Sequence, residues 1–391
     1  QLQAFGTLNS WLIQLVNILT GNLDREGGAL VTQPLIPITG PGTRPGHYAQ
    51  WTSRVSGLPE SGGELPVAAL AEEILTPGEG QIRGLITICG NPVLSTPDGR
   101  GLDDALASLE FMLSVDIYLN ETTRHADLIL PPTSSLNHDH YDLIFNALAI
   151  RNVARFNAGI WPRPDDERYD WEIFRELCIR LAARLGREHK PLPSTAAAIE
   201  HRLHGTSMEA LRNATHGLDL GPLAPSLYER LETADAKIDC APAPLLADVE
   251  RFRAQTTTAA FTLIGRRHLR SNNSWMHNSH RLIKGKARDQ LMMHPDDLAS
   301  LGLADGQTVE VRANVGSVRI AVQATDTMMR GVVSLPHGFG HNRPGTRLGF
   351  AEANAGVSYN DLTDAGAVDK LSGNAALNGV AVEVFPATAQ E

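Results

Sequence analysis

The stretch 84–132 constrains the fold most strongly, because it alternates short apolar runs with a helical pattern. The nearly continuous apolar run 85–89 predicts a strand buried on both faces. Apolar residues then recur at helical spacing over 102–112, and two further strands are predicted at 115–119 and 127–130. A strand, a helix and a second strand joined by a right-handed crossover predict a parallel sheet that binds ligands at the carboxyl ends of its strands.

The rest of the chain has different hydrophobic patterns from this stretch. The amphipathic segment from Phe5 to Thr20 predicts a buried helix, and another helix is predicted from Asp170, as its N-cap, to Leu185. Several short alternating strands after Phe261 predict a closed barrel. We therefore expect an α/β parallel-sheet (Rossmann-like) domain followed by a β-barrel domain. The expected segments are 1–80 (the end of a preceding α/β region, with many loops), 81–190 (Rossmann-like), 191–255 (a connector over the surface) and 256–391 (the barrel).

Composition excludes several classes of partner. A net charge of −10 argues against a nucleic-acid or anionic-membrane surface. No apolar run approaches the roughly 18 residues of a membrane span. The three cysteines, Cys89, Cys178 and Cys240, form no CxxC pair, so they predict reduced, buried thiols in a cytoplasmic protein and provide no iron–sulfur or zinc site. Because Gln1 begins what resembles the middle of a domain, we expect the C-terminal portion of a longer polypeptide.

The first candidate site follows the strand 85–89. Gly90, before Asn91 and Pro92, would let backbone amides approach a phosphate closely, although a plain turn explains the same residues. Asp116, in the predicted second strand, suits a nucleotide base or ribose, because a carboxylate accepts from both N1–H and the amine of guanine. The alternative for Asp116 is an exposed strand edge. For Asp170 the alternative is simple helix capping.

The second candidate site is the segment 265–275, which contains three arginines, one histidine and two asparagines after a predicted strand. So many long donors suit a loop around a polyanionic ligand better than a core, although a solvated basic turn is the alternative. The segments 358–363 and 377–380 offer further amides. His337 and His341 have the spacing of a helical metal pair, but the glycines between them make a helix improbable, so we expect no metal there. We likewise favour a loop near a cofactor for the segment 137–140.

Five stretches taken together resemble the molybdopterin oxidoreductases of the dimethyl-sulfoxide-reductase family, which include formate dehydrogenases and nitrate reductases. These stretches occur in the family's order and extend over nearly the whole chain. They are Leu19-Thr20-Gly21-Asn22 with Gly27-Gly28, then Gly90-Asn91-Pro92, the segment 121–131, the Gly265-Arg266 loop and the segment 294–306.

The resemblance implies two molybdopterin guanine dinucleotides that hold molybdenum or tungsten, and a double-psi topology for the barrel. The α/β part would bind the guanosine diphosphate end of one dinucleotide, with Gly90, Asn91 and Pro92 at its phosphates and Asp116 on its base or ribose. His138, where some relatives have Lys, and Asp170 would contact the same dinucleotide. The barrel would hold pterin and phosphates through Arg266, Arg267, His268, Asn272, Asn273, Trp275, Asn360 and Asn378.

The same resemblance places the catalytic groups outside this chain. The family's metal ligand (Cys, selenocysteine, Ser or Asp) and its [4Fe–4S] cluster precede the region matched here, so the chain holds no catalytic or metal-ligating residue and would be inactive alone. We expect a formate-dehydrogenase-like enzyme for two-electron redox of a small substrate, which passes electrons to an electron-transfer subunit. The alternative is a non-catalytic scaffold, as in respiratory complex I. A free-standing guanine-nucleotide binder is excluded by the missing GxxxxGK[ST] loop.

Overall fold

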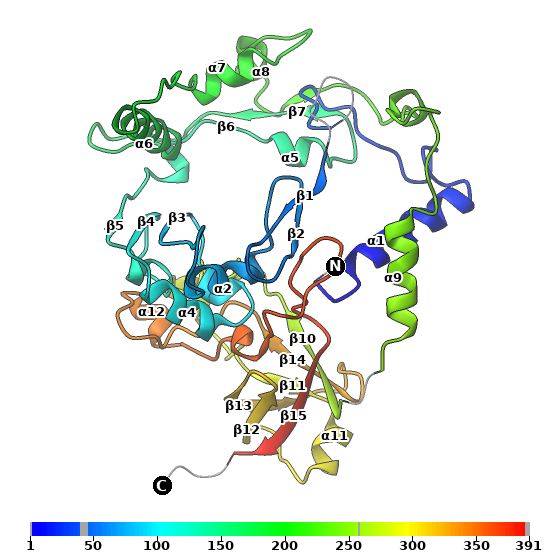
Figure 1. Ribbon diagram of the computed structural model, residues 1–391, viewed down its shortest axis with the longest axis vertical. Coiled ribbons are helices and arrows are strands. Elements are labelled where there is room, and N and C mark those ends of the chain that lie inside the picture. The colour runs from blue at the N-terminus through cyan, green and yellow to red at the C-terminus, as the bar shows by residue number, and fades with distance from the viewer. Residues whose placement is uncertain (1, 40–45, 257–258, 388–391) are drawn as a thin grey trace. The chain divides into compact units, whose positions relative to one another are not determined.

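The computed structural model describes residues 2–39, 46–256 and 259–387. They form two compact units, each built from distant parts of the sequence (Figure 1). The units cut across the four segments expected from the sequence. The first contains Gln1–Ser10, His47–Ile129 and Ala243–Glu391, and the second contains Trp11–Gly46 and Leu130–Pro242.

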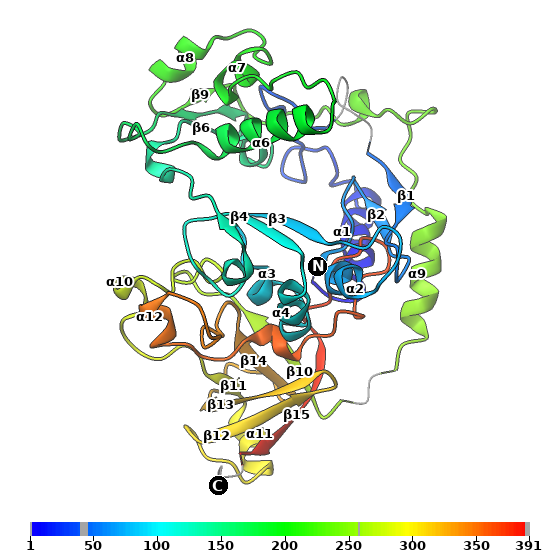
Figure 2. The same ribbon diagram turned by 60° about the vertical axis from the view of Figure 1, so that its left-hand side comes forward.

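A three-stranded parallel sheet lies in the first unit, as predicted. Its strands are β3 (Gly84–Ile88), β4 (Phe111–Val115) and β5 (Leu128–Ile129), in that order. Helices α3 (Pro92–Ser95) and α4 (Gly99–Ala107) connect β3 to β4 and lie on one side of the sheet (Figure 2). Their apolar side chains form a core with β4 and α2 (Leu70–Leu75) that contains Ile74, Val93, Leu102, Ala105, Leu106 and Met112.

Two details of this sheet differ from the prediction. The helix ends at Ala107 and the second strand runs 111–115, not 115–119. The strand stops there because the carboxylate of Asp116 accepts hydrogen bonds from the N–H groups of Ile117 and Tyr118, which removes them from the strand ladder. β3 is not buried on both faces, since Ile86 and Ile88 are 48% and 55% exposed while the helices cover only the other face.

A closed six-stranded barrel forms the second part of the first unit, as the alternating strands predict. Inward-facing residues such as Leu263, Val311 and Leu335 are fully buried and form its core. The hairpin turn at Asn314 and Val315 lies where the sequence predicts it. Around the barrel the order is β10 (Phe261–Arg266), β14 (Val332–Pro336), β11 (Leu291–Met293), β13 (Gly316–Ala324), β12 (Thr308–Ala313) and β15 (Val380–Pro386).

Shorter elements complete the first unit. The hairpin β1–β2 precedes α2, and α9 packs against the start of the chain through an edge-to-face contact of Phe252 with Phe5. The bounds are β1 (Tyr48–Thr52), β2 (Pro59–Ser61), α2 (Leu70–Leu75), α9 (Ala243–Arg253), α10 (His280–Ile283), α11 (Pro295–Ser300), α12 (Gly349–Glu352) and the 3-10 helix η5 (Tyr359–Leu362).

The second unit is built of short strand pairs and helices. β6 pairs with β8 and β7 with β9, both antiparallel. Residues 199–218, predicted as part of a surface connector, contribute instead to the core of this unit, because Met208 and Leu211 pack against Ala154 and Phe156. The bounds are α5 (Leu143–Asn146), α6 (Asp170–Arg184), α7 (Thr195–Glu200), α8 (Met208–Asn213), β6 (His140–Tyr141), β7 (Val153–Ala154), β8 (Phe156–Asn157) and β9 (Leu218–Asp219).

Two helices differ from their prediction. α1 (Gly6–Leu19) was expected to be buried, but Val16 and Leu19 are 60% and 74% exposed and its buried residues are Gly6 and Leu8. α6 does not take Asp170 as its N-cap: Tyr169 occupies that position, and the Glu172 carboxylate accepts a hydrogen bond from its N–H at 3.0 Å. Among the described residues no helix combines the length and apolarity needed to cross a bilayer.

Candidate functional site

The carboxyl end of β3 borders a small pocket, here called the strand-end pocket. The pocket brings together two stretches that the sequence analysis assigned to one ligand, Gly90 and Asn91 after β3 and the loop after β10. Its volume is about 100 Å³, and it is lined by Cys89, Gly90, Asn91, Leu94, Ser95, Asn273, Ser274, Trp275, His337 and Gly338.

Within the described residues the strand end has free backbone donors, whereas its Asn91 side chain is bonded within the fold. The Asn91 amide group donates to the Glu121 carboxylate at 2.7 Å and its oxygen accepts from the Thr122 hydroxyl at 2.8 Å, so the side chain is already paired. The N–H groups of Gly90 and Asn91, by contrast, donate to no acceptor within the described residues. Pro92 starts α3 and has no N–H. An anion here would therefore meet two backbone donors.

The cysteines differ from the prediction of buried thiols. Cys89 and Cys178 are exposed, and Cys240 is partly exposed. Cys89 follows a strand whose outer face is open, and it adopts a positive φ of 47°.

The loop after β10 divides into a structural part and an open part. The Arg266 guanidinium donates to the carbonyls of Ser334, Arg288 and Gln290, and burial lowers its pKa to about 10. Arg266 thus closes the barrel wall, contrary to the expectation that it lies in an open ligand loop. Arg267 is exposed and bonds to Asn273.

The remaining loop residues lie on strained or exposed backbone. Asn272 and Asn273 adopt positive φ angles of 41° and 59°, a conformation that costs free energy and often marks ligand sites. The Nδ1 atom of exposed His268 accepts from the Arg270 N–H at 3.0 Å, and desolvation with three nearby arginines lowers the pKa of His268. Trp275 lies 6.1 Å from Tyr118, measured between ring centroids.

Two other residues that were predicted to bind the cofactor form hydrogen bonds within the first unit. The Asn360 side chain is fully buried and donates to the Leu94 carbonyl at 2.8 Å. The Asn378 oxygen accepts from the Gly265 N–H at 2.8 Å. Both side chains join segments far apart in the sequence, which accounts for them without a ligand.

Asp116 is not the exposed strand-edge residue of the alternative interpretation, since it is 1% exposed. Besides the two N–H groups that end β4, its carboxylate receives the Asn120 amide at 3.4 Å. Burial raises the pKa of Asp116. Its pairing with guanine stays a prediction.

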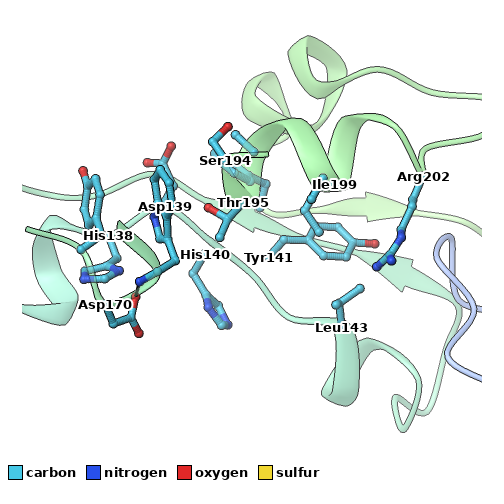
Figure 3. Close-up of a pocket in the computed structure, with 15 residues that line it drawn as sticks. His138, Asp139, His140, Tyr141, Leu143, Asp170, Ser194, Thr195, Ile199 and Arg202 are labelled. Carbon is cyan, nitrogen blue, oxygen red and sulfur yellow. Dashed lines mark hydrogen bonds between the residues drawn. The ribbon is translucent and has the colours of Figure 1, made fainter. Parts of the chain in front are cut away.

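His138 and Asp170 come together in the second unit, where they line one pocket of about 420 Å³ (Figure 3). The His138 ring meets Tyr169 edge-on, with 4.7 Å between centroids, and Trp171 stacks on Tyr169 at 6.1 Å. At the other end, the Tyr141 hydroxyl is buried and has no hydrogen-bond partner among the described residues. The pocket thus combines aromatic rings, a carboxylate and an unpaired hydroxyl.

The two histidine segments considered as metal sites form no helical ligand pair. The segment 337–341 is not helical, as its glycines predict. In the segment 137–140, His138 lies against Tyr169 while the His140 ring is 3.7 Å from Asp142. No group of three potential metal ligands occurs within the ranges that the structure describes.

Sequence reasoning missed a buried network beside the strand-end pocket. Glu121, His341, His277 and Ser271 form consecutive hydrogen bonds of 2.8, 2.9 and 2.9 Å. Each residue is at most 5% exposed. The only available signal was the presence of Glu121 and His341 in two separate segments of the sequence, because nothing in their spacing pairs them.

The sequence and the fold match known proteins. Residues 1–180 match the family described as molybdopterin oxidoreductase, and residues 261–381 match the molydopterin dinucleotide binding domain. The chain belongs to the molybdopterin oxidoreductase family, the dimethyl-sulfoxide-reductase family of the sequence analysis.

Individual relatives differ in the reactions their names state. The chain is 28% identical to biotin sulfoxide reductase of Cereibacter sphaeroides, over 70% of this chain and 42% of that protein. It is 25% identical to the F420-dependent formate dehydrogenase 1 subunit alpha of Methanococcus maripaludis, over 66% of this chain and 39% of that protein. Acetylene hydratase from Pelobacter acetylenicus has a similar fold, with a TM-score of 0.61, 16% identity and coverage of 84% of this chain and 47% of that chain. The chain thus spans less than half the length of these proteins.

Proposed function

We propose that this chain is the cofactor-binding half of a bis-molybdopterin guanine dinucleotide oxidoreductase that carries out two-electron redox on a small substrate. The observation that carries the proposal is the strand-end pocket, which is lined by Gly90 and Asn91, whose N–H groups have no acceptor within the described residues, together with Asn273 and Trp275. Two backbone N–H donors beside a side-chain amide suit the phosphates of a dinucleotide. The match to a dinucleotide-binding domain supports the same assignment.

We further propose that the second-unit pocket, with His138 and Asp170, takes a guanosine end of the cofactor. Tyr169 and Trp171 offer flat faces, and the Asp170 carboxylate can accept from N1–H and the amine of guanine.

In the whole enzyme the bound cofactor and its metal supply the redox chemistry. The residues of this chain bind and orient it. We propose that the metal ligand and a [4Fe–4S] cluster precede the matched region, that electrons leave through an electron-transfer subunit, and that the enzyme works in the cytoplasm. The formate dehydrogenase relative supports a formate-dehydrogenase-like reaction, although the sulfoxide reductase relative points to a different substrate.

Guanine-nucleotide binding tests this proposal. Titration of the 391-residue chain with GDP in a calorimeter should give saturable binding, and ADP should bind at least about tenfold more weakly, because adenine lacks the donor pair that a carboxylate recognises. Equal affinity for GDP and ADP would contradict the assignment of Asp116 and Asp170 to guanine. No binding of either nucleotide would contradict the dinucleotide site itself.

One observation favours the alternative, a non-catalytic scaffold. Arg266, Asn360 and Asn378 have structural partners, so a protein that binds no cofactor would retain them too. Metal and guanine content of the purified full-length protein distinguish the two. A metal-binding enzyme contains about one molybdenum or tungsten and two guanines per chain by the family's stoichiometry, whereas a scaffold contains neither.

A further inference from the structure

The hydrogen bonds of Glu121, His341, His277 and Ser271, named here the Glu121–Ser271 network, connect the two walls of the strand-end pocket. At one end, Glu121 accepts from the side chain of Asn91, which follows β3. At the other end, Ser271 and His277 are bonded at 2.9 Å and enclose the loop residues that line the pocket. One continuous set of hydrogen bonds therefore runs from one wall to the other.

The network has one fixed donor. The Glu121 carboxylate can only accept, so His341 donates to it through Nδ1. The Nε2 atom of His341 is hydrogen-bonded to Nδ1 of His277, and Nε2 of His277 to the Ser271 hydroxyl. Burial raises the pKa of Glu121, but the hydrogen bond and the electrostatic attraction of His341, together with the hydrogen bond from Asn91, hold it below its usual value, which fits the ionised acceptor.

Close packing holds the network in place. Phe339 packs against the His277 ring, with 4.2 Å between centroids and an angle of 34° between the ring planes. Gly338 lies against the loop so closely that a Cβ there would meet the Asn273 carbonyl oxygen at 2.1 Å. A Cβ on Gly340 would meet that of Ser358 at 2.7 Å. The two glycines between the histidines of 337–341 thus allow this segment to lie between the loop and η5.

We propose that Glu121, His341 and His277 are positioning residues that hold Asn91 and the loop Ser271–His277 at the separation that the phosphates of the dinucleotide require. The inference rests on the proposed function, since it assigns the rigid spacing to that ligand. None of the three side chains touches the pocket itself. Their effect passes through Asn91 on one wall and through Ser271 on the other.

Glu121→Gln is the variant that tests the inference. Asn91 and His341 donate to different oxygens of Glu121, so the NH2 group of glutamine would face one of these two donors and that hydrogen bond would be lost. Glu60→Gln is the matched control, because Glu60 is also fully buried and also lies 2.8 Å from a histidine, His47, but shares no hydrogen bond with the network.

Three measurements on the 391-residue chain are compared. In the wild type, nitrogen NMR of labelled histidines should show His341 protonated at Nδ1, and Glu121→Gln should shift the nitrogen signals of His341. Tryptic cleavage after the exposed Arg270 and the Kd for GDP should each rise at least about tenfold in Glu121→Gln, as expected for a lost buried charged hydrogen bond. Glu60→Gln should leave the histidine signals, the cleavage rate and the Kd as in the wild type.

Ser271→Ala removes only the last hydroxyl of the network and should raise cleavage after Arg270 about fivefold, so it tests the inference even if Glu121→Gln does not fold. The inference is overturned if the two variants keep wild-type cleavage and wild-type Kd, or if Glu60→Gln changes them equally. If the wild-type chain binds no GDP, the proposed function fails, and the assignment of the network to a ligand fails with it. The rate of cleavage after Arg270 and the histidine signals then still decide whether the network holds the loop in place.

Discussion

Lowering the pH should destabilise this protein through His277, which is 2% exposed. Burial, together with the neighbouring His341 and Arg288, lowers the pKa of His277 to about 3. In an unfolded chain a histidine has a pKa of about 6.5, so the unfolded state binds the proton first as the pH falls. The contribution of neutral His277 to stability is therefore complete above pH of about 6.5 and is lost progressively towards its folded pKa.

The size of the effect follows from the difference between the pH of the experiment and the pKa of the unfolded histidine. At pH 5 the solution is about 1.5 units below the unfolded pKa, and each unit costs about 1.4 kcal/mol, so the free energy of unfolding falls by about 2 kcal/mol. His337, whose pKa burial and Arg267 lower to about 4, titrates over an overlapping range. A titration of the wild type alone would contain both histidines.

The comparison with His277→Gln isolates the effect, because glutamine takes up no proton. Urea unfolding at pH 7.5 and pH 5.0 gives a free energy for each protein, and the loss on acidification should be smaller in His277→Gln by about 2 kcal/mol. His189→Gln, at an exposed histidine, serves as the control and should lose as much as the wild type. If His277→Gln loses as much as the wild type between these two pH values, His277 is not held neutral by the fold and the reasoning is refuted.

Three further predictions concern single side chains. Asp103→Asn should lower the free energy of unfolding by about 3–5 kcal/mol, measured by urea, because Asp103 pairs with Arg343, Arg124 and His125; a loss below about 1 kcal/mol would contradict this. Gly338→Ala should cost about 1–3 kcal/mol and weaken GDP binding, because its φ is 94° and its new Cβ would push the pocket loop away; unchanged stability and Kd would show that the close approach is unimportant. Asp116→Asn in the full-length enzyme should lower the bound guanine and molybdenum, and full retention of both would remove Asp116 from the site.

The periodic parts of the fold were predictable because their residues alternate as their burial does. In β12 and β13, Val309, Val311, Val318 and Val322 all face the barrel core. The second strand of the parallel sheet was misplaced because Val115 to Leu119 continues the apolar pattern past the strand end. There the Asp116 carboxylate accepts hydrogen bonds from backbone N–H groups that would otherwise join the strand ladder. The hydrophobic pattern of the sequence does not reveal such a hydrogen bond.

The residues of the strand-end pocket were predictable by type but not by role. Gly90 and Asn273 do lie together, as motifs that recur around one ligand lead one to expect. A sequence pattern cannot tell whether a donor faces a ligand or a carbonyl of its own fold, and Arg266 and Asn360 prove to do the latter. Glu121 and His341 were not predictable as a pair, since 220 residues separate them along the chain and only the folded structure brings them together.

These roles change which features distinguish a cofactor binder from a scaffold. The number of hydrogen-bond donors in the loop does not distinguish them, because Arg266 bonds to backbone carbonyls of the barrel domain in a scaffold as well as in an enzyme. The N–H groups of Gly90 and Asn91 and the positive φ angles of Asn272 and Asn273 do, since a bound phosphate would pair the former and strained backbone often marks ligand sites. Beside a network that connects the two walls of the strand-end pocket, these positions are the structural argument for a ligand in that pocket.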